Sequence, residues 1–239
     1  MITIENADCW EFLSQQSDID LLLTDPPYGV TGIDWDVELD CKRWWDAVES
    51  CLSENATVIM TAQQPFASRL IMSSPLKFRQ ELIWEKPNGT GHVKYGPNRC
   101  HENVLIWVKG KSVYNPQMTE GKPYNWKSTR SKGEASAFSG SGEITNTGTR
   151  HPRSVQRFAQ QRGLHPTQKP VKMFEFLIES YSNENDLVCD PFLGSGTTAV
   201  ASYTTSRRFV GCDSNEKYAK ESIARIETIK NLTNIRSMI

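Results

Sequence analysis

The sequence lacks the features that mark membrane-spanning, exported or metal-binding proteins. No apolar run approaches the roughly 18 residues that a transmembrane helix needs, and the N-terminal MITIENADCWEFL has no basic or strongly apolar region typical of a signal peptide. The six cysteines form no CxxC pair, and the four histidines show no metal-ligand spacing. We therefore expect a cytoplasmic protein without a membrane or metal partner, with reduced and mostly buried thiols at Cys9, Cys41, Cys51, Cys100, Cys189 and Cys212.

Length and the alternation of apolar segments predict one α/β domain. The 239 residues, 38% hydrophobic and 23% charged, suffice for one substantial core. Apolar runs alternate with segments of helical spacing, which indicates a parallel sheet covered on both faces. We expect strands at 2–4, 19–24, 57–62, 81–86, 104–109, 186–190 and 208–213, and helices at 41–54, 65–74, 171–182 and 216–232. Because no helix separates 81–86 from 104–109, one of these edge strands is expected to be antiparallel.

The segment from Lys109 to Gly163 differs from the rest of the chain in charge and composition. It carries ten Lys and Arg against three Glu, a net charge of +7, which leaves −8 for the remainder because the whole chain has −1. A basic block on an acidic chain is typical of a surface that binds a polyanion. Within it, 128–149 is too poor in apolar residues to order itself alone, and a passive surface loop is the alternative. Interleaved aromatic residues favour nucleic-acid contact: Tyr114, Tyr124, Trp126 and Phe138.

The tetrapeptide Asp25-Pro26-Pro27-Tyr28 directly follows the apolar run IDLLLT. Proline fixes φ and removes a backbone donor, so the carbonyls of this turn point in defined directions as acceptors. Asp25 adds a carboxylate acceptor and Tyr28 a stacking face. Such a group can hold the exocyclic amino group of a planar base, whereas the plainer interpretation is a solvated turn after a strand.

A second turn, DPFLGSGTT (190–198), follows a strand and opens a helix. Gly194 and Gly196 let the backbone pass close to a ligand. The turn is not GxGxxG, because no third glycine follows, and it is not a P-loop, because no Lys follows. Asp213, at the end of the next strand, is placed to accept both hydroxyls of a ribose; a helix N-cap for the segment starting at Ser214 is the alternative.

These motifs together resemble the beta-class DNA amino-methyltransferases. DPPY resembles their active-site motif, DPFLGSGTT their FxGxGTT motif for S-adenosylmethionine (SAM), and GCDSNEKYAKESIARI the acidic strand and helix that follow it. HPTQKP (165–170) is similar to the segment that closes over the methionine end of SAM, and NADCWEFL to the segment whose aspartate reaches its adenine. The order, with DPPY first and FLGSGTT last, is the permuted order of this class.

The resemblance implies a Rossmann-like methyltransferase fold, formed by a mostly parallel twisted sheet with one antiparallel edge strand and a circularly permuted motif order. Residues 1–239 would form a single catalytic domain, with 112–163 as an inserted target-recognition region. The catalytic residues would be Asp25, Pro26, Pro27 and Tyr28. SAM would be held by Asp8, Cys9, Asp25, His165, Thr167, Lys169, Asp190, Phe192, Gly194, Ser195, Gly196, Thr197, Thr198 and Asp213. DNA would be bound by Lys127, Arg130, Lys132, Arg150, Arg153 and Arg157.

The implied reaction is methyl transfer from SAM to an amino group of a base flipped out of double-stranded DNA. Tyr28 would stack on the base while the Asp25 side chain and the Pro26 carbonyl accept the two amino N–H bonds. Asp at the first position resembles N6-adenine enzymes, whereas beta-class N4-cytosine enzymes more often carry Ser. The absence of a Pro-Cys nucleophile argues against cytosine C5 chemistry.

Other functions stay open. They are N4-cytosine methylation, an RNA or protein amino-methyltransferase, a catalytically inactive DNA-binding relative and a Rossmann dehydrogenase. A homodimer and a cognate restriction enzyme are further partners compatible with the class. The sequence fixes neither the oligomeric state nor the recognition site.

Overall fold

A computed structural model of the chain describes residues 1–29, 37–90, 94, 96–127, 143–161 and 168–237. The chain divides into two compact units. Unit 1 comprises Met1–Asn115 and Ser154–Ile239, and unit 2 comprises Pro116–Arg153. Among the described residues, no helix is long and apolar enough to cross a membrane. All six cysteines are free thiols; Cys51, Cys189 and Cys212 are buried and Cys100 is exposed.

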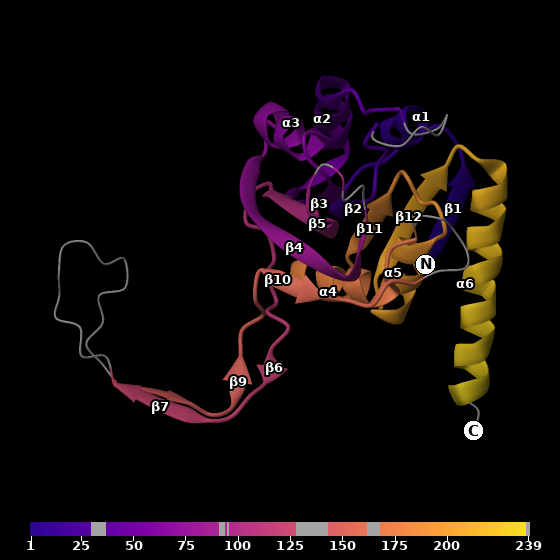
Figure 1. Cartoon of the computed structure of the whole chain (residues 1–239). Helices are drawn as coiled ribbons and strands as arrows, with labels where there is room; N and C mark the ends of the chain where they lie inside the picture. The colour runs from indigo at the N-terminus through magenta and orange to yellow at the C-terminus, as the bar shows by residue number, and fades with distance from the viewer. Residues whose placement is uncertain (30–36, 91–93, 95, 128–142, 162–167, 238–239) are drawn as a thin grey trace. The chain divides into compact units, whose positions relative to one another are not determined.

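Unit 1 is a sheet flanked by helices (Figure 1). Its strands are β1 Ile2–Asn6, β2 Ile19–Thr24, β3 Leu52–Ala62, β4 Lys77–Thr90, β5 Arg99–Val108, β10 Val155–Arg157, β11 Leu187–Asp190 and β12 Arg208–Asp213. Its helices are α1 Cys9–Ser14, α2 Cys41–Cys51, α3 Phe66–Ser73, α4 Val171–Tyr181, α5 Thr197–Thr204 and α6 Glu216–Ser237. The strand order is β1-β12-β11-β2-β3-β5-β4-β10.

The sheet is mostly parallel, and the predicted Rossmann-like fold class is confirmed. Neighbouring strands from β1 to β3 pair in parallel. One part of the prediction is wrong: the antiparallel strand, β5, is not at the edge. It lies between β3 and β4 and runs antiparallel to both, while β10 pairs in parallel with the outer side of β4. The short connection returns the chain beside β3, and the late segment 155–157 then covers the edge of β4.

Both faces of the sheet are buried because its central strands are apolar at successive positions. In β2, Leu22 packs with the helices α1, α2 and α3, whereas Leu21 and Leu23 pack with α4, α5 and α6. The large aromatic residues Trp44, Trp45 and Trp107 lie in the first of these two cores and are fully buried. Alternation across the pleat therefore assigns each side chain to one of two helix layers.

The boundary between α2 and β3 differs from the expected one. A helix was expected over 41–54 and a strand over 57–62, but α2 ends at Cys51 and β3 begins at Leu52. Leu52 has the extended dihedrals φ −78° and ψ 140° and pairs with Ile19 of β2. The apolar spacing of the segment fits a helix, but its last residues belong to β3, which pairs with β2, and do not continue α2.

Unit 2 consists of two small antiparallel ribbons. Strand β6 Thr119–Glu120 pairs with β9 Thr149–Arg150, and β7 Tyr124–Lys127 pairs with β8 Glu143–Asn146. Within the predicted segment 128–149, residues 143–146 thus form a ladder through backbone pairing, which composition did not predict. Residues 128–142 lie outside the described residues. That 112–163 serves target recognition stays a prediction, and its residues 155–157 belong to the sheet of unit 1.

Candidate active site

The motifs of the sequence meet at one edge of the unit 1 sheet. Because β12, β11 and β2 are parallel neighbours, their carboxyl ends lie side by side. The DPPY segment follows β2, the glycine turn follows β11, and Asp213 ends β12. In open parallel sheets, ligands bind outside these carboxyl ends.

The Asp25 carboxylate is held on both oxygens. Its Oδ1 accepts hydrogen bonds from the Tyr28 hydroxyl, at 2.5 Å, and from the Thr61 hydroxyl. Its Oδ2 accepts a hydrogen bond from Lys169 Nζ at 2.5 Å. Tyr28 Oη also lies 2.8 Å from Thr61 Oγ1. Because a phenol has one proton, it donates to Asp25 or to Thr61 but not to both at once.

Tyr28 is largely buried, with 8% of its surface exposed. Its ring centroid lies 5.8 Å from that of Phe66 in a tilted arrangement. Burial, and then the charges of Asp25 and Glu102, raise the pKa of Tyr28 well above its ordinary value, so the phenol is neutral. The stacking role expected for Tyr28 stays a prediction.

Three further charged side chains of unit 1 follow Asp25 in a chain of ion pairs. Lys169 Nζ lies 3.4 Å from Glu102 Oε2, and Lys86 Nζ donates to Glu102 Oε1. The side chains of Lys169 and Glu102 are each 7% exposed. Burial alone disfavours both charges, but the opposite charges outweigh it: the pKa of Lys169 is raised and that of Glu102 is lowered. The opposite charges therefore keep Lys169 and Glu102 ionised, and Asp25, Lys169, Glu102 and Lys86 are called the charge row below.

The glycine turn requires its glycines for two different reasons. Gly194 and Gly196 have φ values of +52° and +75°, in the left-handed region. A Cβ on Gly196 would also stand 2.8 Å from Ser222 Oγ, whereas one on Gly194 would meet nothing within 4 Å. Helix α6 fixes the turn, since Ser222 Oγ donates to the Gly194 carbonyl at 3.0 Å and Arg225 Nη1 to the Ser195 carbonyl at 2.6 Å.

Asp190 joins the glycine turn to the strand that leads into DPPY. Its Oδ1 accepts from Thr24 Oγ1 at 2.6 Å and from the Phe192 amide at 3.0 Å. Its Oδ2 accepts from Thr198 Oγ1. Burial raises the pKa of Asp190 to about 6. Asp190 and Thr198 are thus occupied by contacts within the protein, and their predicted role towards SAM stays a prediction.

Asp213 supports the glycine turn from the next strand. Its Oδ2 accepts from the Gly194 amide and its Oδ1 from the Asn215 amide, both at 2.8 Å. The N-cap of α6 is Asn215, whose Oδ1 accepts from the Lys217 amide at 3.0 Å. The alternative interpretation of Asp213 as a helix N-cap is therefore wrong.

Other predicted cofactor residues that the structure describes follow the carboxyl ends of β1 and β11. Asp8 is exposed and caps α1, accepting from the Trp10 and Glu11 amides at 2.9 and 3.4 Å. Burial raises the pKa of the Cys9 thiol to about 12. The Phe192 ring lies 5.7 Å from that of Trp44. Thr197 Oγ1 lies 3.2 Å from Ser195 Oγ and donates to the Lys169 carbonyl at 3.3 Å. His165 and Thr167 lie outside the described residues.

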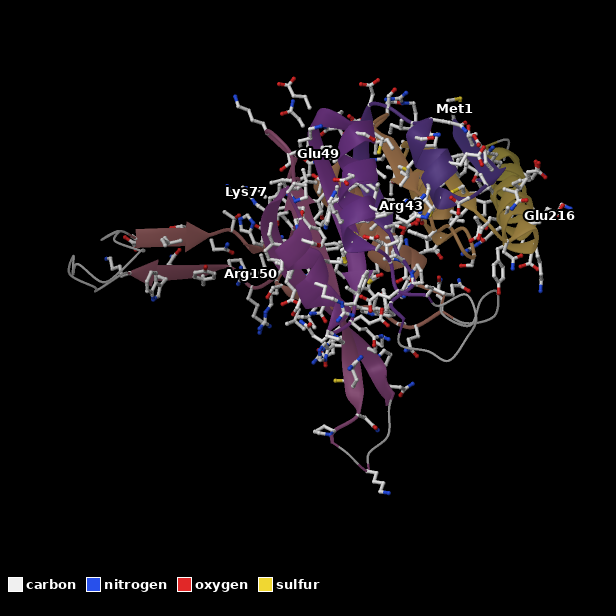
Figure 2. The ribbon with its side chains drawn as sticks, turned by 90° about the horizontal axis from the view of Figure 1, so that it is seen from above. Met1, Arg43, Glu49, Lys77, Arg150 and Glu216 are labelled. Atoms are coloured by element: carbon white, nitrogen blue, oxygen red, sulfur yellow. The ribbon has the colours of Figure 1, made fainter. Side chains whose placement is uncertain are left out.

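The predicted DNA-binding residues are split between the two units. In unit 2, Lys127 is exposed and lies 3.7 Å from Glu143 Oε2, and Arg153 is exposed. Arg150, labelled in Figure 2, lies with its guanidinium 4.7 Å from the centroid of the Tyr124 ring. In unit 1, Arg157 Nε donates to Glu85 at 2.7 Å. Arg130 and Lys132 lie outside the described residues.

Sequence reasoning missed three residues that contact the site, Thr61, Glu102 and Lys86. For two of them, Glu102 and Lys86, the sequence contains a spacing that could have identified them. Glu102 continues the inward face of Val104 in β5 at a spacing of two residues, and Lys86 continues the face of Trp84 in β4. Residues two positions apart in a strand share a face. A charged residue that shares its face with buried apolar residues is therefore a candidate for a buried charge with an oppositely charged partner.

An α/β sheet with a glycine turn, an acidic strand end and a hydrogen-bonded carboxylate at one edge is typical of enzymes that bind nucleotide-like cofactors. The DNA methylase family model matches residues 19–224. The chain belongs to this family, and the predicted class of DNA amino-methyltransferase is confirmed.

Curated relatives agree with this family, and solved structures agree with the fold. Type II methyltransferase M1.MboII of Moraxella bovis is 28% identical over 245 residues, covering 92% of this chain and 94% of the relative. M2.DpnII of Streptococcus pneumoniae is 26% identical over 262 residues, covering 96% and 90%. The M1.HpyAVI–SAM complex matches with a TM-score of 0.67 at 24% identity, covering 94% of this chain and 100% of that one. The PvuII DNA methyltransferase (cytosine-N4-specific) matches with 0.68 at 16%, covering 98% and 93%. At these identities the two structures support the fold alone.

Proposed function

We propose that this protein transfers a methyl group from SAM to the N6 amino group of adenine in double-stranded DNA. The observation that carries the proposal is the meeting of three motifs at Lys169. Its ammonium contacts Asp25 of DPPY, and its carbonyl accepts a hydrogen bond from Thr197 of the glycine turn. A methyl-donor site and an amino-group acceptor must lie side by side for direct transfer, and this residue joins the two.

The SAM site proposed here lies along the ends of β1, β12 and β11. The backbone of the Gly194–Gly196 turn passes close to the ligand, as its left-handed conformation and its anchoring by α6 favour. Asp213 and Asp8 supply acceptors for the ribose hydroxyls and the adenine. When bound, SAM would supply a methyl group on a positively charged sulfur: the base nitrogen would bond to the methyl carbon, the sulfur would leave with the electron pair of the broken C–S bond, and the methylated amino group would then lose one proton to water.

The proposed role of DPPY is to present the amino nitrogen. A carboxylate offers about four acceptor positions, and the contacts with Tyr28, Thr61 and Lys169 leave at least one for an amino N–H. The Pro26 carbonyl accepts the second N–H. These two hydrogen bonds draw the nitrogen lone pair out of conjugation and orient it, and much of the acceleration then comes from alignment in a water-poor site.

Adenine is proposed rather than cytosine because the first residue of the motif is Asp. Both bases present an amino group beside a ring nitrogen, so N4-cytosine methylation is the alternative. An RNA or protein substrate and an inactive DNA-binding relative are further alternatives. The cytoplasm is the proposed location, and a homodimer and a cognate restriction enzyme are the proposed protein partners.

Unit 2 is proposed to bind DNA through the ribbon β7–β8. Tyr124 and Trp126 lie two residues apart on one strand and hence on one face, opposite Asn146 and Ile144 of the other strand. Trp126 is 51% exposed. Exposed aromatic rings beside cations are typical of surfaces that contact bases and phosphates. Lys127, Arg150 and Arg153 would supply the charge, together with Arg130, Lys132 and Arg157.

The central test is transfer of labelled methyl from SAM to unmethylated DNA by the purified protein. We expect incorporation into DNA, and a loss of at least about 10³-fold in Asp25→Ala, because the reacting nitrogen loses its acceptor. Calorimetry with SAM on the same variant tests the second role predicted for Asp25, as a SAM ligand. A matched control is Asp46→Ala, since Asp46 is exposed and pairs only with Lys42 on the surface of α2. Full activity of Asp25→Ala would contradict the catalytic assignment.

Product analysis separates the alternatives. Digestion of the labelled DNA to nucleosides should give N6-methyladenine. Detection of N4-methylcytosine instead would show that the target base is cytosine. Label found only in RNA or protein would select those substrates. No incorporation with intact SAM and DNA binding would identify an inactive relative.

A further inference from the structure

The charge row behind DPPY is an unusual arrangement for a residue expected to touch the cofactor. The segment HPTQKP resembles one that closes over SAM, yet the ammonium of its Lys169 lies between two carboxylates. It lies 2.5 Å from Asp25 Oδ2 and 3.4 Å from Glu102 Oε2. The backbone carbonyl of Lys169 accepts a hydrogen bond from Thr197 of the glycine turn.

The Glu102 side chain has capacity left on the side of Lys169. Its Oε1 accepts from Lys86, and the Gln63 amide lies 3.5 Å away. Its buried Oε2 has no hydrogen-bond partner among the described residues and stands at ion-pair distance from the ammonium. Glu102 therefore holds Lys169 mainly through charge, which lets the ammonium lean towards Asp25.

A buried charge row of this kind is poor evidence for a purely stabilising role. Removing charges from water costs free energy that their attraction recovers only in good geometry, and apolar replacements are often neutral or stabilising. The row ends at Asp25, the group that would receive the amino nitrogen. Its more specific consequence is that Asp25 is fixed: Oδ2 is bound to Lys169 and Oδ1 to the two hydroxyls, which opposes rotation of the carboxylate.

We propose that Lys169, held from behind by Glu102, is a positioning residue that orients the Asp25 carboxylate for methyl transfer. This inference rests on the proposed function. Lys169 acts on the reaction through Asp25, not through SAM. A carboxylate that is already oriented accepts the amino N–H without rearrangement during the reaction, which is the advantage of a preorganised acceptor.

The test separates chemistry from cofactor binding. For Lys169→Met, we expect a single-turnover rate at saturating SAM and DNA about 10²-fold below the wild type, since misplacement of a reacting group by about 1 Å has this effect. The SAM dissociation constant, measured by calorimetry, should stay unchanged. Lys169→Arg should recover part of the rate. Lys42→Met, at an exposed lysine in a surface ion pair, is the matched control and should keep the full rate.

Glu102→Gln keeps the test decisive if Lys169→Met does not fold, and a double variant sharpens it if Lys169→Met does fold. Glu102→Gln preserves the size and one acceptor but removes the charge, and should slow the same single turnover without changing SAM affinity; Glu81→Gln, at an exposed position of β4, is its control. In an Asp25→Asn background, Lys169→Met should cause no additional loss, because residues that act as one unit are not additive.

The outcomes distinguish this inference from the proposed function. A wild-type protein that methylates no DNA would overturn both. If the wild type is active and Lys169→Met weakens SAM binding but keeps the saturated rate, Lys169 is a cofactor ligand and the inference fails alone. An unchanged rate in Glu102→Gln, or additive losses in the double variant, would also overturn it.

Discussion

In unit 1 the charged residues beside DPPY are buried against one another, whereas most charged residues of unit 2 that the structure describes are exposed. Lys169 and Glu102 are each 7% exposed, and each has an oppositely charged partner. None of the described residues of unit 2 is fully buried. We therefore expect charge in unit 1 to set the geometry of the proposed site, and charge in unit 2 to contact DNA. Changes in unit 1 should affect stability and chemistry, and changes in unit 2 should affect DNA affinity alone.

The largest effect on stability is expected at the glycine turn of unit 1. Gly196→Ala forces a left-handed residue to carry a Cβ that meets Ser222, so we expect a loss of about 3 kcal/mol in the free energy of unfolding, together with loss of SAM binding. Gly194→Ala, left-handed but without a clash, should cost only about 1 kcal/mol. Urea unfolding of both variants measures the difference, and equal losses would contradict the close contact with Ser222.

A second test of unit 1 uses pH at Asp190. Burial raises the pKa of Asp190 from its ordinary value of 3.8 to about 6 in the folded protein, so the folded state holds this proton more tightly than the unfolded state. This contribution is fully present below pH about 4 and is lost as pH rises through 6. The stability of the wild type relative to Asp190→Asn should therefore fall by on the order of 2 to 3 kcal/mol between pH 4 and 7. A difference that does not vary with pH would show that Asp190 titrates normally.

In unit 2, the aromatic face of the ribbon gives the next effect. Trp126→Ala should weaken DNA binding by about 1 to 3 kcal/mol, the usual contribution of a ring stacked on a base. The melting temperature and SAM affinity should not change, since Trp126 is exposed and no residue of a core loses a contact. Fluorescence anisotropy with labelled DNA measures the first quantity. A lower melting temperature would instead show that Trp126 supports the fold.

The smallest effect is expected for single cations. Lys127→Ala should weaken DNA binding similarly on all sequences and reduce the slope of log affinity against log salt by about one. Arg157→Ala is a useful contrast because Arg157 is held by Glu85 in unit 1. If Arg157→Ala changes the salt slope as much as Lys127→Ala does, Arg157 contacts phosphate despite its partner.

Much of unit 1 could be predicted from the pattern of apolar residues. The strand over 19–24 and that over 208–213 have the predicted bounds, because continuous apolar runs fit a sheet buried on both faces. The place of β5 inside the sheet could not be predicted, since it depends on β5 rather than β4 pairing with β3. The ladder of unit 2 was also missed because it relies on backbone pairing and leaves little trace in composition.

The sequence by itself determined the parallel α/β class, the order of the motifs and the residues Asp25, Gly194, Gly196 and Asp213 as candidates, since local spacing and residue chemistry record these. Only the tertiary structure decided that Lys169 faces Asp25 across 144 positions of the chain and that Glu102 stands behind it. Such contacts follow from strand order and from which side of the pleat each residue occupies. No local pattern encodes the distance between two strand ends, so the charge row at the site emerges only when the sheet is assembled.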